Sequence, residues 1–273
     1  MFELFIEMIS YTFIQRALIV GSLVSICASL LGVSLVLKRY SMLGDGLSHV
    51  GFSILTIATA LGFTSPLYIS IPGVIITAIV LLKVGNNKKI KADSSIALIS
   101  SSALALGVVV TSFTTGLNTD VCNFMFGSIL AMTKSDVYLS VFVSILVVII
   151  FIIFYRKIFA ITFDEDFSKA SGIKVEKYTN ILAILTAVVI VIGMRMMGTL
   201  LISSIIIFPA LTSMRIFKTF KKVIISSAII GLSSFLIGIF VSYIFNISTG
   251  ASIVLINLLL FIIFSILNKI MYE

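Results

Sequence analysis

Residues 50–82, VGFSILTIATALGFTSPLYISIPGVIITAIVLL, contain no charged side chain. About 20 apolar residues are enough for a helix to cross a membrane, so this stretch is long enough for two crossings. Prolines at 66 and 72 interrupt it, and the residue before a proline is biased away from the helical conformation. The sequence therefore predicts two spans, at about 46–62 and 66–84, with a turn at 62–66.

The composition extends this interpretation to all 273 residues. The chain is 60% hydrophobic and only 11% charged, whereas a soluble domain carries about 25% charged residues. No polar segment is long enough to form a separate soluble domain, so we interpret residues 1–273 as a single transmembrane domain. The net charge of +8 does not indicate a nucleic-acid partner, because the basic residues are distributed like those of membrane-protein loops.

Other apolar runs of similar length predict the remaining spans. The pattern predicts an interfacial lead-in at 1–15, non-helical structure at 40–46 and a re-entrant or interfacial helix at 118–134. The fold class is therefore an all-α, polytopic membrane protein with about eight to nine transmembrane helices, a re-entrant helix and a short polar helix near residue 167. The further spans are expected at about 17–37, 95–115, 137–155, 178–194, 199–217, 223–245 and 250–268.

The positive charges predict the orientation of the chain. If Lys38 and Arg39 are cytoplasmic, alternation places five segments on that side, and these hold 16 of the 19 Lys and Arg residues. Cytoplasmic loops carry such an excess, so we expect an external N-terminus, a cytoplasmic C-terminus and a multi-pass protein of the cell membrane. The five segments are 38–39, 83–91, 156–177, 215–222 and Lys269.

The stretch Gly44–His49 holds the chain's one histidine, with Asp45 four residues before it. On a helix both side chains project from one face, and ionisable residues beside a long apolar run are usually functional or paired. A carboxylate and an imidazole can share a divalent cation. They can also bond only to each other, and the spacing alone leaves both hypotheses open.

Other polar residues are weaker candidates. Asp120, Cys122 and Asn123 are either metal ligands near an entrance or a capped turn of the re-entrant segment. Met194, Met196 and Met197 surround Arg195, and we expect packing methionines beside a free-standing interfacial arginine. Pro209 lies inside an apolar span, where proline removes a backbone hydrogen bond and is expected to kink the helix.

The polar segment at 163–173 predicts a short helix. Asp164, Glu165 and Asp166 cluster at its start, where the helix dipole favours negative charge, and Gly172 is suited to end it. Such a helix between two spans either meets a partner protein or is an ordinary solvated loop helix. The residues alone do not choose between these two interpretations.

Taken in order, five motifs resemble the permease subunit of the ABC importers that take up zinc, manganese or iron. The resemblance covers essentially the whole chain and includes a departure at Gly46, where a small residue such as alanine is commoner. The motifs are RYSMLGDGLSH at 39–49, FGSIL at 126–130, FDE and ASG within 163–172, GTLL at 198–201 leading to Pro209 and Ala210, and STGA at 248–251.

The resemblance implies a transporter subunit and not an enzyme, with no permanently bound cofactor. It implies two copies of the permease around one pathway, two cytoplasmic ATP-binding subunits and an extracellular metal-binding receptor protein. Asp45 and His49 match positions associated with the path of the zinc or manganese ion. The segment Asp164–Gly172 matches the coupling helix that contacts the ATPase, and its members Asp164, Glu165, Asp166, Phe167, Ala170 and Gly172 are the expected coupling residues.

Three alternatives compete with this interpretation. A permease of the same class for a siderophore or cobalamin is opposed by the Asp–His pair and the short chain. A secondary metal-ion carrier would need acids within its spans, and Asp45 is the one acid we place there. An intramembrane protease or hydrolase would need a second membrane aspartate or an activated serine, and the sequence offers neither in a convincing context.

Overall fold

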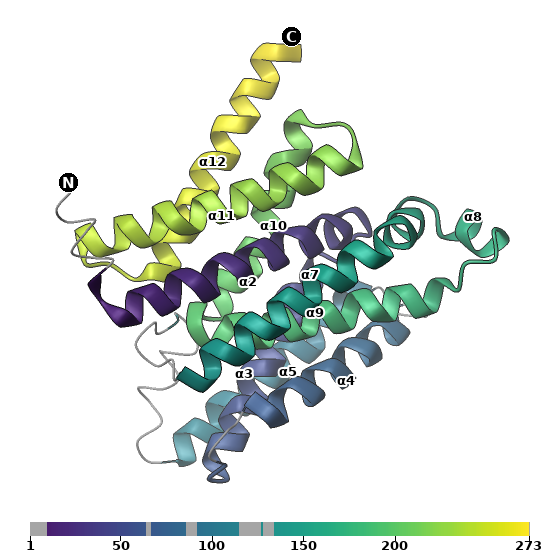
Figure 1. Ribbon diagram of the computed structural model, residues 1–273. Helices are drawn as coiled ribbons and strands as arrows, with labels where there is room; N and C mark the ends of the chain where they lie inside the picture. The colour runs from purple at the N-terminus through teal and green to yellow at the C-terminus, as the bar shows by residue number, and fades with distance from the viewer. Residues whose placement is uncertain (1–9, 64–66, 86–91, 115–126, 128–133, 273) are drawn as a thin grey trace.

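The computed structural model of the protein describes residues 10–63, 67–85, 92–114, 127 and 134–272 (Figure 1). Its regular structure in these ranges is entirely helical. Apart from the six-residue α8, the described helices contain 18 to 30 residues. They are α2 (Thr12–Leu37), α3 (Met42–Ala60), α4 (Leu67–Gly85), α5 (Ala92–Phe113), α7 (Lys134–Phe163), α8 (Glu165–Ala170), α9 (Val175–Met197), α10 (Thr199–Ile216), α11 (Phe220–Phe245) and α12 (Thr249–Tyr272).

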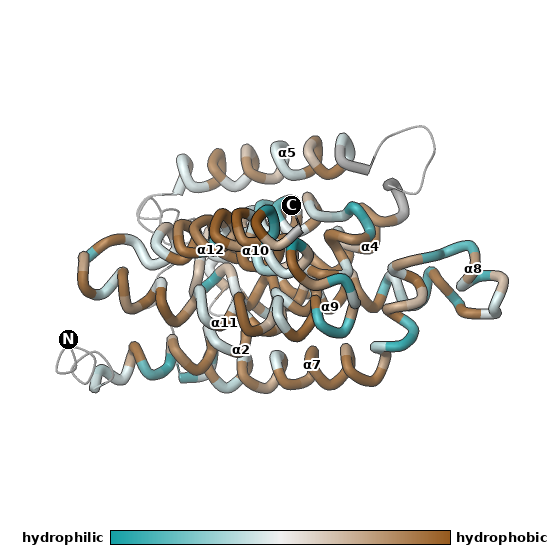
Figure 2. The backbone as a smooth tube through the Cα atoms, turned by 90° about the horizontal axis from the view of Figure 1, so that it is seen from above, coloured by the Kyte–Doolittle hydropathy of each residue, from teal (hydrophilic) through white to brown (hydrophobic). Residues whose placement is uncertain are grey.

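The helices form a bundle around α2, α9 and α10, whose side chains are mostly buried. Helices α5, α7 and α12 are mostly exposed although they are apolar. Figure 2 shows that hydrophobic residues dominate along α7 and α12 and alternate with more polar residues along α5. In a water-soluble protein such surfaces would be unfavourable, but a lipid environment accepts them. Seven of the described helices are long and apolar enough to cross a membrane.

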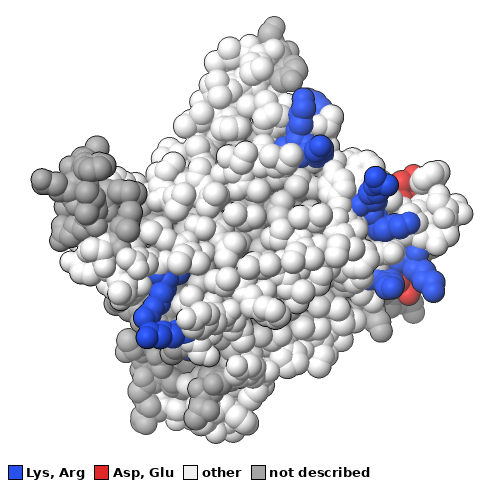
Figure 3. All heavy atoms as spheres, viewed as in Figure 1, with Lys and Arg blue, Asp and Glu red and all other residues white. Residues whose placement is uncertain are grey.

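Basic side chains gather mainly at the end of the molecule that carries α8 and near the corner between α10 and α11, with a smaller group at the opposite end (Figure 3). This distribution agrees with the predicted charge asymmetry between the two sides of the membrane. The orientation of the chain across the membrane stays a prediction.

The predicted all-helical class is confirmed, and the predicted spans coincide with helices. The number of eight to nine transmembrane helices stays a prediction. The re-entrant helix expected at 118–134 and most of the lead-in at 1–15 lie outside the described residues, as does Pro66. The sequence predicted an interruption near Pro72, but helix α4 continues through this residue.

Two predicted boundaries are wrong. Helix α3 already begins at Met42, so the non-helical prediction for 40–46 holds at 40–41 and fails at 42–46. Leu43 is buried there, and the Leu43 N–H donates to the Tyr40 carbonyl at 3.0 Å. Helix α7 continues past Arg156 and Lys157 to Phe163. Both basic side chains are exposed while Ile158 and Ile161 remain buried, so the helix keeps one apolar face beyond the point where the span was expected to end.

Glycine allows α2 and α10 to approach closely. A Cβ atom on Gly32 would lie 1.8 Å from the carbonyl oxygen of Ile206. The obstacle is backbone, which cannot rotate away, so no larger side chain fits here without separating the two helices. Small residues have this role at helix crossings in membranes.

We expect Gly32→Ala to destabilise the purified protein by about 2 kcal/mol, because overpacking a fixed helix crossing costs 1–3 kcal/mol. The matched control is Gly73→Ala in α4, where the nearest obstacle is the mobile Cδ1 end of Ile54 at 2.7 Å. The measurement is unfolding in detergent by temperature or denaturant. Equal stability of the two variants would contradict the tight crossing.

Candidate metal site and cytoplasmic helix

Asp45 and His49 lie together at the start of α3. Asp45 is in the first helical turn, where the helix dipole stabilises a carboxylate. Its Oδ1 atom is 3.6 Å from His49 Nε2, and the two side chains are 42% and 19% exposed. The distance is longer than a good hydrogen bond, so the carboxylate and the imidazole face the same space without bonding directly to each other.

Helix α10 contributes a hydroxyl to the same place. Ser203 Oγ lies 3.5 Å from Asp45 Oδ1 and donates to the Thr199 carbonyl at 3.0 Å. Ser48 Oγ donates to the Asp45 carbonyl at 2.7 Å and lies 3.5 Å from Ser203 Oγ. No pattern in the sequence points to Ser203, because a linear motif does not bring together two residues 158 positions apart.

The depth of Asp45 follows from the packing around Ile206. A Cβ on Gly32 of α2 would meet the Ile206 backbone, and one on Gly44 of α3 would meet the Ile206 side chain at 3.2 Å. Gly44 therefore lies near the level of Gly32, which is about 7.5 Å from the end of α2 at Leu37, at 1.5 Å per residue. After Lys38 the chain turns back, and the start of α3 packs against α10.

The site offers one carboxylate and one imidazole, a donor set suited to zinc or manganese. His49 Nδ1 is buried and has no hydrogen-bond partner, so Nε2 is the nitrogen that faces Asp45 and the exposed side. Within the described part of the chain, no third His, Cys, Asp or Glu joins these two. A four-coordinate ion would need further ligands from water or from another chain.

The expected short helix is present as α8, and its ends have clear causes. Asp164 is the N-cap, and its Oδ1 accepts from the Phe167 N–H at 2.8 Å. Gly172 has a φ of +78°, and the Gly172 N–H donates to the Lys169 carbonyl at 3.0 Å, which ends the helix. Glu165 and Asp166 occupy the first turn.

The outer face of α8 is open to solvent. Phe167 is 67% exposed, and Ala170 is exposed on the same short helix. Ser168 points the other way and is buried. An exposed phenylalanine on a polar helix is suited to bind a partner groove, although the coupling role itself stays a prediction.

Arg195 is not the free-standing residue that the sequence predicted. Its Nη1 atom is 2.8 Å from Asp136 Oδ1, and the two side chains are 25% and 14% exposed. The pair joins the start of α7 to the end of α9. Met194, Met196 and Met197 are buried in the core, as expected for packing residues.

The other candidates differ in how far the structure describes them. Pro209 lies buried inside α10, which continues through it, and a kink there stays a prediction. Asp120, Cys122 and Asn123 lie outside the described residues. Gly127 is described: its φ is +83°, and a Cβ there would lie 2.5 Å from the Met197 carbonyl carbon, so this motif glycine contacts the end of α9.

The fold and the half-exposed Asp–His pair define a multi-pass membrane protein with polar groups held inside a helical bundle. Residues 10–268 match the sequence model of the ABC 3 transport family. The chain belongs to this family, and it is a transporter subunit and not an enzyme.

Known relatives cover nearly the same length. The chain is 33% identical over 253 residues to the manganese import system permease protein ScaB of Streptococcus gordonii, covering 93% of this chain and 90% of the relative. It is 30% identical over 249 residues to the high-affinity zinc uptake system membrane protein ZnuB of Haemophilus influenzae, covering 90% and 94%. The solved structure of PsaBC from Streptococcus pneumoniae in complex with Fab superposes with a TM-score of 0.87 at 31% identity, covering 97% of this chain and 95% of that chain.

Proposed function

We propose that this chain is the membrane permease of an ATP-driven importer for divalent metal ions, zinc or manganese. The observation that carries the proposal is the Asp45–His49 pair, which presents a carboxylate oxygen and an imidazole nitrogen 3.6 Å apart inside the bundle. Relatives named as manganese and zinc permeases support the same substrate class. The whole chain then acts as one permease domain, and the metal is cargo and not a resident cofactor.

Two copies of the permease enclose the pathway in this proposal. One chain supplies two strong ligands, and two chains related by a twofold axis would supply four, which is the number that zinc prefers. Two carboxylates would neutralise the charge of a divalent ion and so reduce the cost of burying it in the apolar bundle. The ion would be released when the two halves separate. Ser203 would position the Asp45 carboxylate through its hydroxyl.

The remaining partners bind at the two opposite ends of the molecule. Two cytoplasmic ATP-binding subunits would bind α8, and an extracellular metal-binding receptor would deliver the ion at the opposite end. ATP binding would move α8 and switch the paired permeases between outward-facing and inward-facing states. Candidate residues for a role near the receptor side are Asp120, Cys122 and Asn123.

The test is elemental analysis of cells that lack their own metal importers. They express the chain with its cognate ATP-binding subunit and receptor, and a control expresses the same set with the ATP-binding subunit omitted. We expect zinc or manganese to rise only with the full set. A rise without the ATP-binding subunit would indicate a secondary carrier. An assembled complex that raises no metal would overturn the proposal in favour of an organic substrate such as a metal chelate.

A further inference from the structure

We propose that Lys38 is a positioning residue that transmits the movement of α8 to the helix carrying Asp45 and His49. The inference rests on the proposed function, because it assigns the internal link between the ATPase side and the metal path. Lys38 belongs neither to α8 nor to the Asp45–His49 pair. The link is an ammonium group at the end of α2 that binds α7 and α8 together.

Lys38 is buried to an unusual degree for a lysine. Its side chain is 3% exposed, and its Nζ atom forms an ion pair with Glu165 Oε1 in the first turn of α8. Glu165 is 43% exposed and can be hydrated on its open side. A charged lysine is almost never fully buried without a partner, so the position of Lys38 depends on this pair.

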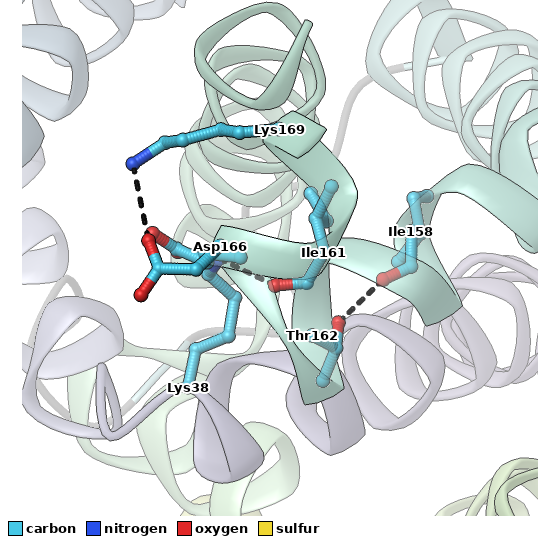
Figure 4. A network of polar contacts seen from close by, with 7 residues as sticks. Lys38, Ile158, Ile161, Thr162, Asp166 and Lys169 are labelled. Atoms are coloured by element: carbon cyan, nitrogen blue, oxygen red, sulfur yellow. Dashed lines mark hydrogen bonds and ion pairs between the residues drawn. The ribbon is translucent and has the colours of Figure 1, made fainter. Parts of the chain in front are cut away.

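The same ammonium also closes the end of α7. Lys38 Nζ donates to the Ile161 carbonyl at 3.1 Å, and Ile161 is in the last turn of α7. Carbonyls at a helix end lack partners within the helix, and a cation there interacts favourably with the helix dipole. Figure 4 shows Lys38 extending from its own helix toward Ile161. One side chain thus fixes the corner between α7 and α8 to the end of α2.

The chain from Lys38 to Asp45 has little freedom of its own. The Tyr40 N–H donates to the Leu35 carbonyl at 2.8 Å, and the Arg39 N–H donates to the Val36 carbonyl at 3.1 Å. Arg39 adopts a φ of +61°, so α2 ends in a Schellman motif with a non-glycine residue in the left-handed conformation. Helix α3 starts two residues after Tyr40. A displacement of Lys38 is therefore carried to the first turn of α3.

The turn also senses the charge of Glu165. The pKa of Tyr40 is raised, first by burial and second by the negative charge of Glu165. The Lys38–Glu165 ion pair places this carboxylate at the end of α2, beside the turn at 39–40.

A cavity of about 330 Å³ lies between α8, α4 and α9, and Glu165, Lys169 and Thr179 contribute to its lining. The second ion pair of α8, Lys169 with Asp166 at 3.9 Å, lies within the helix itself and is exposed, at 59% and 99% for the two side chains. Such a pair contributes little, and it ties α8 to nothing else. Figure 4 shows it beside Lys38.

The test compares Lys38→Met with Lys169→Met in the complete complex. Methionine has a similar length and tolerates burial, and Glu165 stays hydrated, so Lys38→Met is expected to assemble. The first readout is amide hydrogen exchange of residues 40–46, measured in the complete complex and in the permease without the ATP-binding subunit. We expect subunit binding to change exchange there in the wild type and in Lys169→Met, and the change to be lost in Lys38→Met.

The second readout is metal transported per ATP hydrolysed, which we expect to fall about tenfold in Lys38→Met, within the range of measured coupling between sites. A merely structural residue would lower the yield of complex and leave this ratio unchanged. If Lys38→Met does not assemble, Glu165→Gln breaks the same pair from its exposed end and is expected to lower the ratio in the same direction. An unchanged ratio and an unchanged exchange response in the assembled variant would overturn the inference. A wild-type complex that moves no metal would instead overturn the proposed function, and hydrogen exchange would still decide the role of Lys38.

Discussion

Asp45→Asn is expected to lower metal uptake about 100-fold, because even residues that only support metal ligands change affinity by 10–100-fold. The amide keeps the shape of the carboxylate and can still accept from Ser203 at the position of Oδ1. It loses the negative charge, which is the property that a hard or borderline divalent cation requires. The measurement is radioactive or elemental uptake by cells expressing the full set of subunits at matched levels of the permease.

Two companion variants separate a metal site from an isolated Asp–His contact. His49→Gln removes the imidazole and is expected to reduce uptake to a similar extent, since Nε2 faces the same space as Asp45 Oδ1. Ser203→Ala removes only the 3.5 Å contact to the carboxylate and is expected to change uptake a few-fold at most. If Asp45→Asn and Ser203→Ala transport metal equally well, the path does not pass between Asp45 and His49.

Phe167→Asp is expected to release the ATP-binding subunit from the membrane complex, with a loss of affinity of more than about tenfold, as for an interface hot spot. Phe167 is 67% exposed, so its removal costs the permease alone little. An aspartate would lie in the first turns of α8, where the dipole favours it, and the Phe167 N–H that bonds Asp164 is unchanged. The helix should persist while its apolar contact surface is lost.

The measurement for Phe167→Asp is co-purification of the ATP-binding subunit from detergent extracts, together with ATP hydrolysis by the purified complex. Lys169→Met is the matched control, because Lys169 is 59% exposed on the same helix, is not among the expected coupling residues, and forms only a weak ion pair with Asp166 within the helix. We expect the control to retain the subunit. Co-purification of Phe167→Asp at the control level would place the contact surface elsewhere.

Local sequence was sufficient for much of the fold. Seven of the described helices are apolar runs long enough to cross a membrane, and in lipid the backbone of such a run must satisfy its own hydrogen bonds as a helix. The short helix α8 was also predictable, since its cap at Asp164 and its end at Gly172 are set by neighbouring residues. The Asp45–His49 pair belongs to the same category, because four residues along a helix bring two side chains to one face.

Boundaries that depend on packing were not predictable. Met42–Gly46 reads as a polar, glycine-rich loop, yet it is helical because Leu43 is buried and Gly44 fits against Ile206. The extension of α7 beyond Lys157 likewise depends on the buried Ile158 and Ile161. In both places tertiary contacts outweighed the local preference of the chain.

The sequence by itself determined an all-helical membrane bundle, a polar helix between two spans and one acid–imidazole pair, because these depend on composition and on spacings of a few residues. Only the tertiary structure decided that Ser203 meets Asp45, that Arg195 pairs with Asp136 and that Lys38 binds Glu165. The physical reason is that each of these contacts joins helices far apart in the chain. Their partners are selected by close packing at Gly32 and similar crossings, which no local pattern encodes.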